Sequence, residues 1–138
     1  MEEAPRSSHV MLIDDDHVTN IVNRKIIHFN YPSVRISTYI DAAIALKQLR
    51  QWAETDIAQL PDLIFLDINM PDMDGWDFLD EFIKLPPLVQ QRTKVIMLTS
   101  SVDINDITKA RTYKPVIDFL SKPLDKGNLK TLIKHEAA

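Results

Sequence analysis

The chain has 138 residues, a formal net charge of −4, two glycines and no cysteine. A chain of this length is one domain of ordinary size, and it buries roughly two-thirds of its unfolded surface without a disulfide or a structural metal. The lack of cysteine excludes disulfides and thiolate metal sites, and two glycines are too few for a glycine-rich nucleotide loop. No apolar run approaches the ~20 residues that cross a bilayer, and no cluster of lysine and arginine favours direct binding to nucleic acid.

The first half of the chain predicts two strand–helix units after a disordered lead over residues 1–8. Residues 9–13 form a strand, and the apolar run Val10-Met11-Leu12-Ile13 is typical of a strand buried on both faces. Residues 17–30 form a helix that Asp16 caps. A strand over 34–39 and a helix over 41–54 follow. The apolar stripe of the first helix is expected at Val18, Ile21, Val22, Ile26, Ile27 and Phe29.

The middle of the chain predicts a third unit. Residues 55–61 form a connection, and the apolar run that follows gives a strand over 63–67. Pro71 and Gly75 shape the loop that leads into a helix over 74–85. Pro86 and Pro87 end that helix, because proline cannot continue a helical hydrogen-bond ladder.

The last part of the chain predicts two more units. Strands are expected at 94–99 and 117–121, and helices at 103–113 and 126–136. The helix over 103–113 has few apolar residues, which indicates a loosely anchored element. Five alternations of strand and helix predict an α/β domain over 9–138, a doubly wound parallel sheet with helices on both faces.

Polar residues follow the predicted strands at the point where each strand ends. In a doubly wound sheet, ligands bind outside the carboxyl ends of the strands. Acids, a hydroxyl and a lysine at these ends would therefore converge on one pocket that could hold a divalent metal and a phosphoryl group. The residues in question are Asp14, Asp15, Asp67, Thr99 and Lys122.

Four motifs in this order resemble the receiver domain of two-component response regulators, as in single-domain chemotaxis regulators. The resemblance covers roughly residues 9–135 and implies the flavodoxin-like fold with strand order 2-1-3-4-5. The motifs are Leu12-Ile13-Asp14-Asp15-Asp16, Asp62-Leu63-Ile64-Phe65-Leu66-Asp67-Ile68-Asn69-Met70-Pro71-Asp72-Met73-Asp74-Gly75, Leu98-Thr99-Ser100 and Phe119-Leu120-Ser121-Lys122-Pro123.

The resemblance implies a phosphoacceptor switch centred on Asp67, which would take a phosphoryl group with the help of Mg²⁺ or Mn²⁺. Thr99 and Lys122 would hold the phosphoryl oxygens. It also implies that the peptide bond between Lys122 and Pro123 is cis. The implied metal ligands are Asp14, Asp15, Asp67 and the backbone carbonyl of Asn69.

Switching would change the surface made by the helix over 103–113, the strand over 117–121 and the last helix. In this scheme Thr99 moves toward the phosphoryl group and Phe119 turns into the space behind it. The implied upstream partner is a histidine kinase or a histidine phosphotransfer protein, and the downstream target is an unidentified protein. The expected location is the cytoplasm, and the expected state is a monomer or a weak phosphorylation-dependent dimer.

Two other functions are weighed against this one. A phosphohydrolase of the haloacid dehalogenase type also uses an aspartate nucleophile, but it needs a second aspartate two residues later, where this chain has Asn69. A degenerate receiver that acts only as an interaction module would have lost an acid, the threonine or the lysine, and none is lost. The chain departs from the commonest receiver pattern at 113–116, which lacks a glycine turn, and in the long connection at 55–61.

Overall fold

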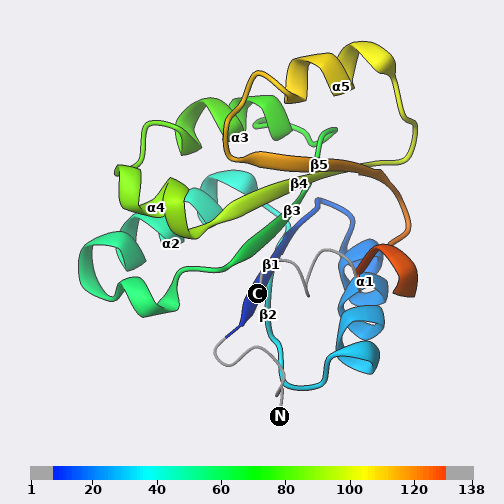
Figure 1. Cartoon of the computed structure of the whole chain (residues 1–138), viewed down its shortest axis with the longest axis horizontal. Coiled ribbons are helices and arrows are strands. Elements are labelled where there is room, and N and C mark those ends of the chain that lie inside the picture. The colour runs from blue at the N-terminus through cyan, green and yellow to red at the C-terminus, as the bar shows by residue number, and fades with distance from the viewer. Residues whose placement is uncertain (1–7, 130–138) are drawn as a thin grey trace.

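The computed structural model describes residues 8–129, which form a twisted parallel sheet covered by helices on both faces (Figure 1). All pairings between neighbouring strands are parallel, and the strand order is β2-β1-β3-β4-β5, as predicted. The strands are β1 (His9–Ile13), β2 (Arg35–Tyr39), β3 (Leu63–Asp67), β4 (Lys94–Thr99) and β5 (Val116–Ser121).

The helices connect successive strands, with α2, α3, α4 and α5 on one face of the sheet and α1 on the other. A further helix begins at Lys126 and continues to the end of the described residues, so most of the helix predicted over 126–136 lies outside them. The helices are α1 (His17–Asn30), α2 (Ala42–Thr55), the short 3-10 helix η1 (Ile57–Gln59), α3 (Gly75–Phe82), α4 (Pro87–Arg92) and α5 (Ile104–Ala110).

Each buried strand contributes alternate residues to two apolar clusters, because successive side chains point to opposite faces of a sheet. In β3, Ile64 and Leu66 join the cluster under α2, α3, α4 and α5. Leu63 and Phe65 join the cluster on the other face, where Ile27 of α1 and Leu129 also pack. The doubly wound architecture therefore follows from strands that are apolar on both faces.

The predicted apolar stripe of α1 is wrong for most of its residues. Val18 and Phe29 are 65% and 85% exposed, whereas Asn20 and Asn23 are 2% and 1% exposed and face the protein. Asn20 has a reason to be inside, because its side-chain amide donates hydrogen bonds to the carbonyls of Asp14 and Tyr39. Polar partners at the end of the sheet thus override hydrophobic periodicity. The N-cap prediction for Asp16 is confirmed, since its carboxylate accepts from the amides of Val18 and Thr19.

The helix predicted over 74–85 is shorter, and a second helix follows it. Asp74 caps α3 in a reciprocal capping box with Asp77, and the helix ends at Phe82. Pro87 then occupies the first position of α4, where its missing amide hydrogen costs nothing. The interpretation of this proline as a terminator was therefore incomplete, since it also begins an element. In the same way, the connection over 55–61 contains η1.

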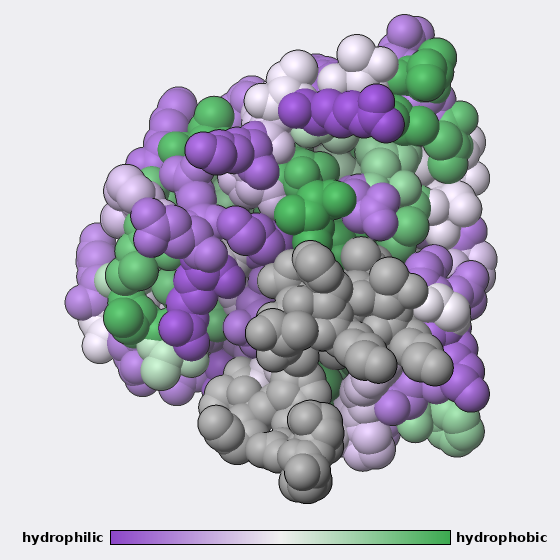
Figure 2. All heavy atoms as spheres, viewed as in Figure 1, coloured by the Kyte–Doolittle hydropathy of each residue, from purple (hydrophilic) through white to green (hydrophobic). Residues whose placement is uncertain are grey.

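The predicted helix over 103–113 is also longer than the observed α5, which ends at Ala110. Its expected loose attachment is confirmed within the described residues, since Ala110 is its one fully buried side chain. Ile104 and the preceding Val102 are 71% and 53% exposed. Hydrophobic atoms are accordingly visible at the surface in the region of α5 (Figure 2).

Candidate functional site

Two aspartates meet at the carboxyl edge of the sheet because β1 and β3 are neighbours in register. Ile13 pairs with Leu66. The residues that follow them, Asp14 and Asp67, therefore lie at the same level of the sheet. One carboxylate oxygen from each of Asp14, Asp15 and Asp67 lies within 4.8 Å of the others. The predicted acidic cluster therefore exists in the fold.

The three carboxylates differ in their surroundings. Asp14 and Asp67 are buried, and Asp15 is exposed. Asp14 is held by backbone on both sides, because its Oδ1 accepts from the Asp16 amide at 2.9 Å and its own amide donates to the Tyr39 carbonyl at 3.0 Å. Asp14 is thus a fixed acid, while Asp15 faces the solvent side of the cluster.

Lys122 provides the positive charge of the site. Its Nζ lies 2.7 Å from Asp14 Oδ2 and 3.2 Å from Asp67 Oδ1. Its amide donates to the Thr99 carbonyl at 2.7 Å, which ties the end of β5 to the end of β4. The Lys122–Pro123 peptide bond is cis, as the resemblance implied. Burial alone would lower the pKa of Lys122, but the hydrogen bond and charge of Asp14, together with Asp67, hold it above its usual value.

The pKa of Asp67 is raised to about 6, first by burial and then by the negative charge of Asp14. Lys122 opposes this rise through its charge and its hydrogen bond, and Asp15 adds to it. A buried carboxylate beside other carboxylates favours any cation that reduces their repulsion. A carboxylate must be ionised to act as a nucleophile. The ionised form of Asp67 is therefore favoured by the positive charges near it.

Thr99 and Phe119 lie beside this cluster on the next strands. Thr99 ends β4 one residue beyond Leu98, the residue that pairs with Asp67. Its hydroxyl donates to the Ser101 carbonyl at 3.1 Å and accepts from the Ser101 amide at 3.3 Å, so it is turned toward the loop after β4. Phe119 pairs with Met97, two residues before Thr99 on the same strand.

The β3–α3 loop brings Asn69 to the same edge of the sheet, and Asn69 is exposed. Asp72 in this loop has a φ of 65°, a conformation that aspartate tolerates in turns. Gly75 closes the loop, with its amide donating to the Ile68 carbonyl at 2.8 Å. A β-carbon on Gly75 would lie 2.7 Å from the Asp67 carbonyl oxygen, so only glycine fits here. The start of α3 is thereby pressed against the backbone of Asp67.

The residues present fit a magnesium ion. Mg²⁺ prefers hard oxygen ligands and keeps several waters, which suits a cluster with two buried carboxylates and one exposed carboxylate. The backbone of the cluster is held by hydrogen bonds that leave carboxylate oxygens of Asp15 and Asp67 facing the same place. Asp14, Asp15 and Asp67 could therefore hold a metal ion.

Asn20 belongs to the support of this site, and the sequence prediction missed it. Its amide bridges the ends of β1 and β2 by donating to the Asp14 carbonyl at 3.0 Å and the Tyr39 carbonyl at 3.3 Å. The one sequence feature that pointed to Asn20 was its position, four residues after the cap Asp16. The other residues expected to be buried on this helix were apolar. Periodicity alone favoured the apolar stripe instead.

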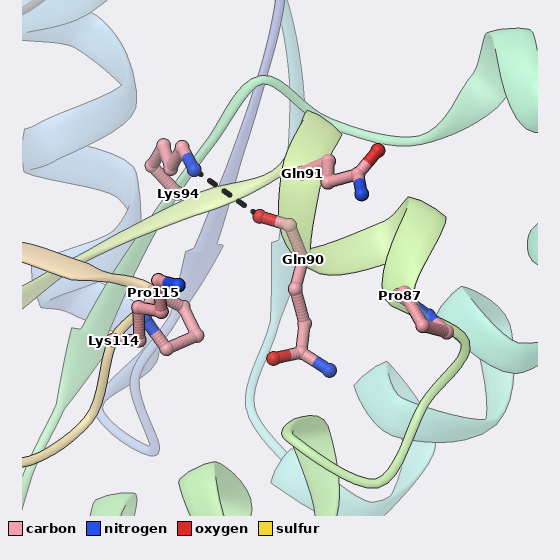
Figure 3. Close-up of a pocket in the computed structure, with 6 residues that line it drawn as sticks. All are labelled: Pro87, Gln90, Gln91, Lys94, Lys114 and Pro115. Carbon is pink, nitrogen blue, oxygen red and sulfur yellow. Dashed lines mark hydrogen bonds between the residues drawn. The ribbon is translucent and has the colours of Figure 1, made fainter.

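A hollow of about 310 Å³ lies at the opposite edge of the sheet, beside the start of β4 and the turn before β5 (Figure 3). It is lined by Pro87, Gln90, Gln91, Lys94, Lys114 and Pro115. Lys94 Nζ donates to the Gln90 carbonyl at 3.3 Å. The lining has no carboxylate or hydroxyl, so it offers neither a nucleophile nor a magnesium ligand, and the acidic cluster remains the candidate site.

The fold is a doubly wound α/β domain with an acidic cluster at the carboxyl edge of its sheet, and the family comparison gives the particular class. The model of the response regulator receiver domain matches residues 10–134. The chain belongs to this family. Within residues 8–129, no helix is long and apolar enough to cross a membrane.

Comparison with individual curated proteins is consistent with this family. The chain is 31% identical over 115 residues to a protein-glutamate methylesterase/protein-glutamine glutaminase 3 of Burkholderia thailandensis, covering 83% of this chain and 29% of that protein. It is 30% identical over 135 residues to the two-component response regulator ORR23 of Oryza sativa subsp. japonica, covering 97% of this chain and 18% of that protein. The chain therefore spans less than a third of the length of these curated relatives.

Solved structures support the same fold. A two-component response regulator from Cytophaga hutchinsonii superposes with a TM-score of 0.86 at 30% identity, covering 95% of this chain and 97% of that one. A response regulator receiver protein from Dyadobacter fermentans gives a TM-score of 0.81 at 28% identity, covering 94% and 97%. Receiver domains bind Mg²⁺ in an acidic pocket and act with histidine kinases or phosphotransfer partners.

Proposed function

We propose that this receiver domain is a phosphoacceptor switch in which Asp67 takes a phosphoryl group from a phosphohistidine. The observation that carries the proposal is the contact set of Asp67, a buried carboxylate beside two other acids and 3.2 Å from Lys122 Nζ. Phosphoryl transfer depends mainly on positioning and on charge neutralisation, and this cluster supplies both.

The transfer step can be written for this chain's residues. An oxygen of the Asp67 carboxylate attacks phosphorus, the bond between phosphorus and the donor imidazole nitrogen breaks, and that nitrogen keeps the electron pair and takes a proton from solvent. Lys122 holds a positive charge next to the attacking carboxylate of Asp67 throughout the step. Asp14, Asp15, Asp67 and the Asn69 carbonyl would hold Mg²⁺ or Mn²⁺, which would add positive charge beside the phosphoryl oxygens.

Thr99 and Phe119 are the residues proposed to change position after the transfer. The Thr99 hydroxyl must leave Ser101 and turn toward the phosphoryl group, which exchanges one hydrogen-bond arrangement for another. Phe119 borders a hollow of about 290 Å³ between α5 and β5, together with Ile107, Ala110, Arg111, Val116, Ile117 and Asp118. Space of this size beside a half-buried ring supports a change of packing on the surface of α5, β5 and the last helix.

Upstream we infer a histidine kinase or a histidine phosphotransfer protein as the donor, and downstream a protein that reads the changed surface. The cytoplasm, the compartment typical of receiver domains, is where we expect the exchange. The chain turns over no external substrate in this proposal, and it is a monomer or a weak phosphorylation-dependent dimer. A degenerate module and an aspartate-based phosphohydrolase are the alternatives that the test must separate.

The test is to incubate the chain with Mg²⁺ and acetyl phosphate, and separately with Mg²⁺ and beryllofluoride. Mass spectrometry should find one phosphoryl group on Asp67, and Trp76 emission should change with beryllofluoride. The Asp67→Asn variant should show neither result. A wild-type chain that gains no phosphoryl group and gives no beryllofluoride response would leave the degenerate module, and turnover of p-nitrophenyl phosphate would favour the phosphohydrolase.

A further inference from the structure

Four side chains from α3, from α5 and from the turn after α5 meet on the surface, and we name them the aromatic clasp: Trp76, Asp80, Lys109 and Tyr113. The rings of Trp76 and Tyr113 stack with centroids 6.0 Å apart and planes 27° apart. Lys109 Nζ lies 4.6 Å from the centroid of a Trp76 ring. The Tyr113 hydroxyl donates to Asp80 Oδ1 at 2.7 Å.

The clasp joins α3 to the last turn of α5 and to the turn that follows it. Trp76 and Asp80 are four residues apart on α3, so they lie on the same side of that helix. Lys109 is in the last turn of α5, and Tyr113 lies in the turn that follows, with its amide donating to the Ala110 carbonyl at 3.0 Å. The clasp therefore fastens the end of α5 to α3.

At its α3 end the clasp is rigidly connected to the phosphoacceptor candidate. Gly75, the residue before Trp76, donates to the Ile68 carbonyl at 2.8 Å and leaves no room for a β-carbon against the Asp67 carbonyl. A shift of the backbone at Asp67 must therefore move the start of α3. Trp76 is the next residue along the chain and would move with it.

At its other end the clasp holds an element with few other attachments. Among the described residues of α5, Ala110 alone is fully buried, and Ile104 at the opposite end is 71% exposed. The hollow beside Phe119 also lies between α5 and β5. An element held in this way can change position if its main attachment changes.

We propose that the aromatic clasp is a second connection between Asp67 and α5, separate from Thr99 and Phe119, and that it holds α5 in the position of the unmodified protein. This proposal rests on the proposed function, since it concerns the response to a phosphoryl group on Asp67. In this proposal the contacts of the clasp stabilise the unmodified state, so weakening them favours the modified state. By reciprocity, binding of a phosphoryl analogue must weaken the clasp.

The experiment uses a Trp52→Phe background, which leaves Trp76 as the one tryptophan of the chain. Trp52 lies at the other edge of the sheet, where its ring contacts His9 at a centroid distance of 5.6 Å. Beryllofluoride with Mg²⁺ is titrated while Trp76 emission and the amide NMR shifts of Ile104–Ala110 are recorded. In the parent chain both signals should change together.

Tyr113→Leu removes the stack and the hydrogen bond, and beryllofluoride should then bind at least about fivefold more tightly. The α5 amides of this variant should lie closer to their shifted positions before any ligand is added. Tyr113→Phe keeps the ring and loses only the hydrogen bond to Asp80, so it tests the same idea with little risk to folding and should give a smaller change in the same direction.

Lys109→Gln and Lys84→Gln form a matched pair, because each removes one positive charge. Lys109 lies over Trp76, whereas Lys84 pairs with Glu81 at 3.1 Å outside the clasp. Of these two variants, only Lys109→Gln should bind beryllofluoride more tightly than the parent chain. Equal affinities for the parent, Tyr113→Phe and Lys109→Gln would overturn the clasp while leaving the proposed function intact, and a parent chain without any response would overturn both.

Discussion

Lys122 Nζ lies 3.2 Å from Asp67 Oδ1, although the two residues are far apart in the sequence and end different, non-adjacent strands. The same ammonium group also contacts Asp14 at 2.7 Å. One positive charge thus serves two buried carboxylates, and the behaviour of Asp67 depends on it.

Lys122→Gln should raise the pKa of Asp67 above about 6, because the charge and hydrogen bond that oppose the rise are lost. Less of the ionised nucleophile and one fewer cation at the reacting group should slow acetyl phosphate transfer at pH 7 by roughly a hundredfold. The ¹³C shift of the Asp67 carboxyl group reports the pKa, and Trp76 emission reports the rate. Lys84→Gln, with the same change of charge, should leave both values unchanged; an unaltered rate in Lys122→Gln would contradict the assigned role.

Asp67→Asn should stabilise the protein when no metal is added. A carboxyl group whose folded pKa is raised from 3.8 to about 6 stabilises the folded state fully below pH 3.8, and this contribution is lost as the pH rises through 6. At pH 7 the wild type has lost it, so the neutral amide should raise the free energy of unfolding by roughly 1 to 3 kcal/mol. Urea unfolding at pH 7 measures the difference.

The control for this prediction is Asp106→Asn on α5, which makes the same chemical change away from the cluster and should alter stability by less than ~0.5 kcal/mol. Added Mg²⁺ should stabilise the wild type and reduce its difference from Asp67→Asn, because an ion that binds only the folded state raises its stability. A less stable Asp67→Asn protein in the absence of metal would show that Lys122 compensates the buried charge fully.

Gly75→Ala should disturb the site through the backbone. The new β-carbon would lie 2.7 Å from the Asp67 carbonyl oxygen and 2.9 Å from Ile68 Cα, and backbone atoms cannot move aside cheaply. We expect a loss of roughly 1 to 3 kcal/mol in stability and weaker beryllofluoride binding. Gly127→Ala is the control, since its β-carbon would meet only the Asp125 carboxylate at 3.4 Å; equal stabilities of the two variants would contradict the close approach.

His9 should make the fold sensitive to mild acid. The pKa of His9 is lowered from 6.5 to about 4, first by burial and then by the nearby Arg35 charge, while a hydrogen bond to the Gln59 carbonyl opposes the shift. Folded protein therefore resists protonation that the unfolded chain accepts, so stability is full above pH 6.5 and falls until about pH 4. The total loss should be roughly 3 kcal/mol.

Unfolding midpoints in urea between pH 7 and pH 4 test this expectation. Replacing the imidazole in His9→Gln should remove most of the His9 contribution to the slope, whatever its effect on stability at pH 7. His28→Gln on the exposed side of α1 should keep the wild-type slope. A steep slope that persists in His9→Gln would assign the acid sensitivity to other groups.

The parallel sheet and the acidic cluster could be predicted from the sequence because both depend on local order along the chain. Strands apolar on both faces alternate with helices, and such strands pair in parallel with their polar ends at one edge. Asp14 and Asp67 therefore meet whatever the details of the helices. The cap at Asp16 could also be predicted, since a cap bonds to amides only two or three residues away.

Other features were decided by contacts between distant segments. The burial of Asn20 in place of Val18 depends on two carbonyls at the ends of β1 and β2, which no periodicity on α1 reveals. The stack of Trp76 on Tyr113 requires α3 and the turn before β5 to lie side by side. The Thr99 hydroxyl has partners in its own loop rather than at Asp67.

The sequence by itself thus determined which chemical groups gather at the carboxyl edge of the sheet, because the alternation of strands with helices and the polar residue that follows each strand are local patterns. The tertiary structure alone decided how those groups are charged and connected. Burial, the 2.7 Å contact between Lys122 and Asp14, and the close approach of Gly75 to Asp67 arise only when distant segments pack together.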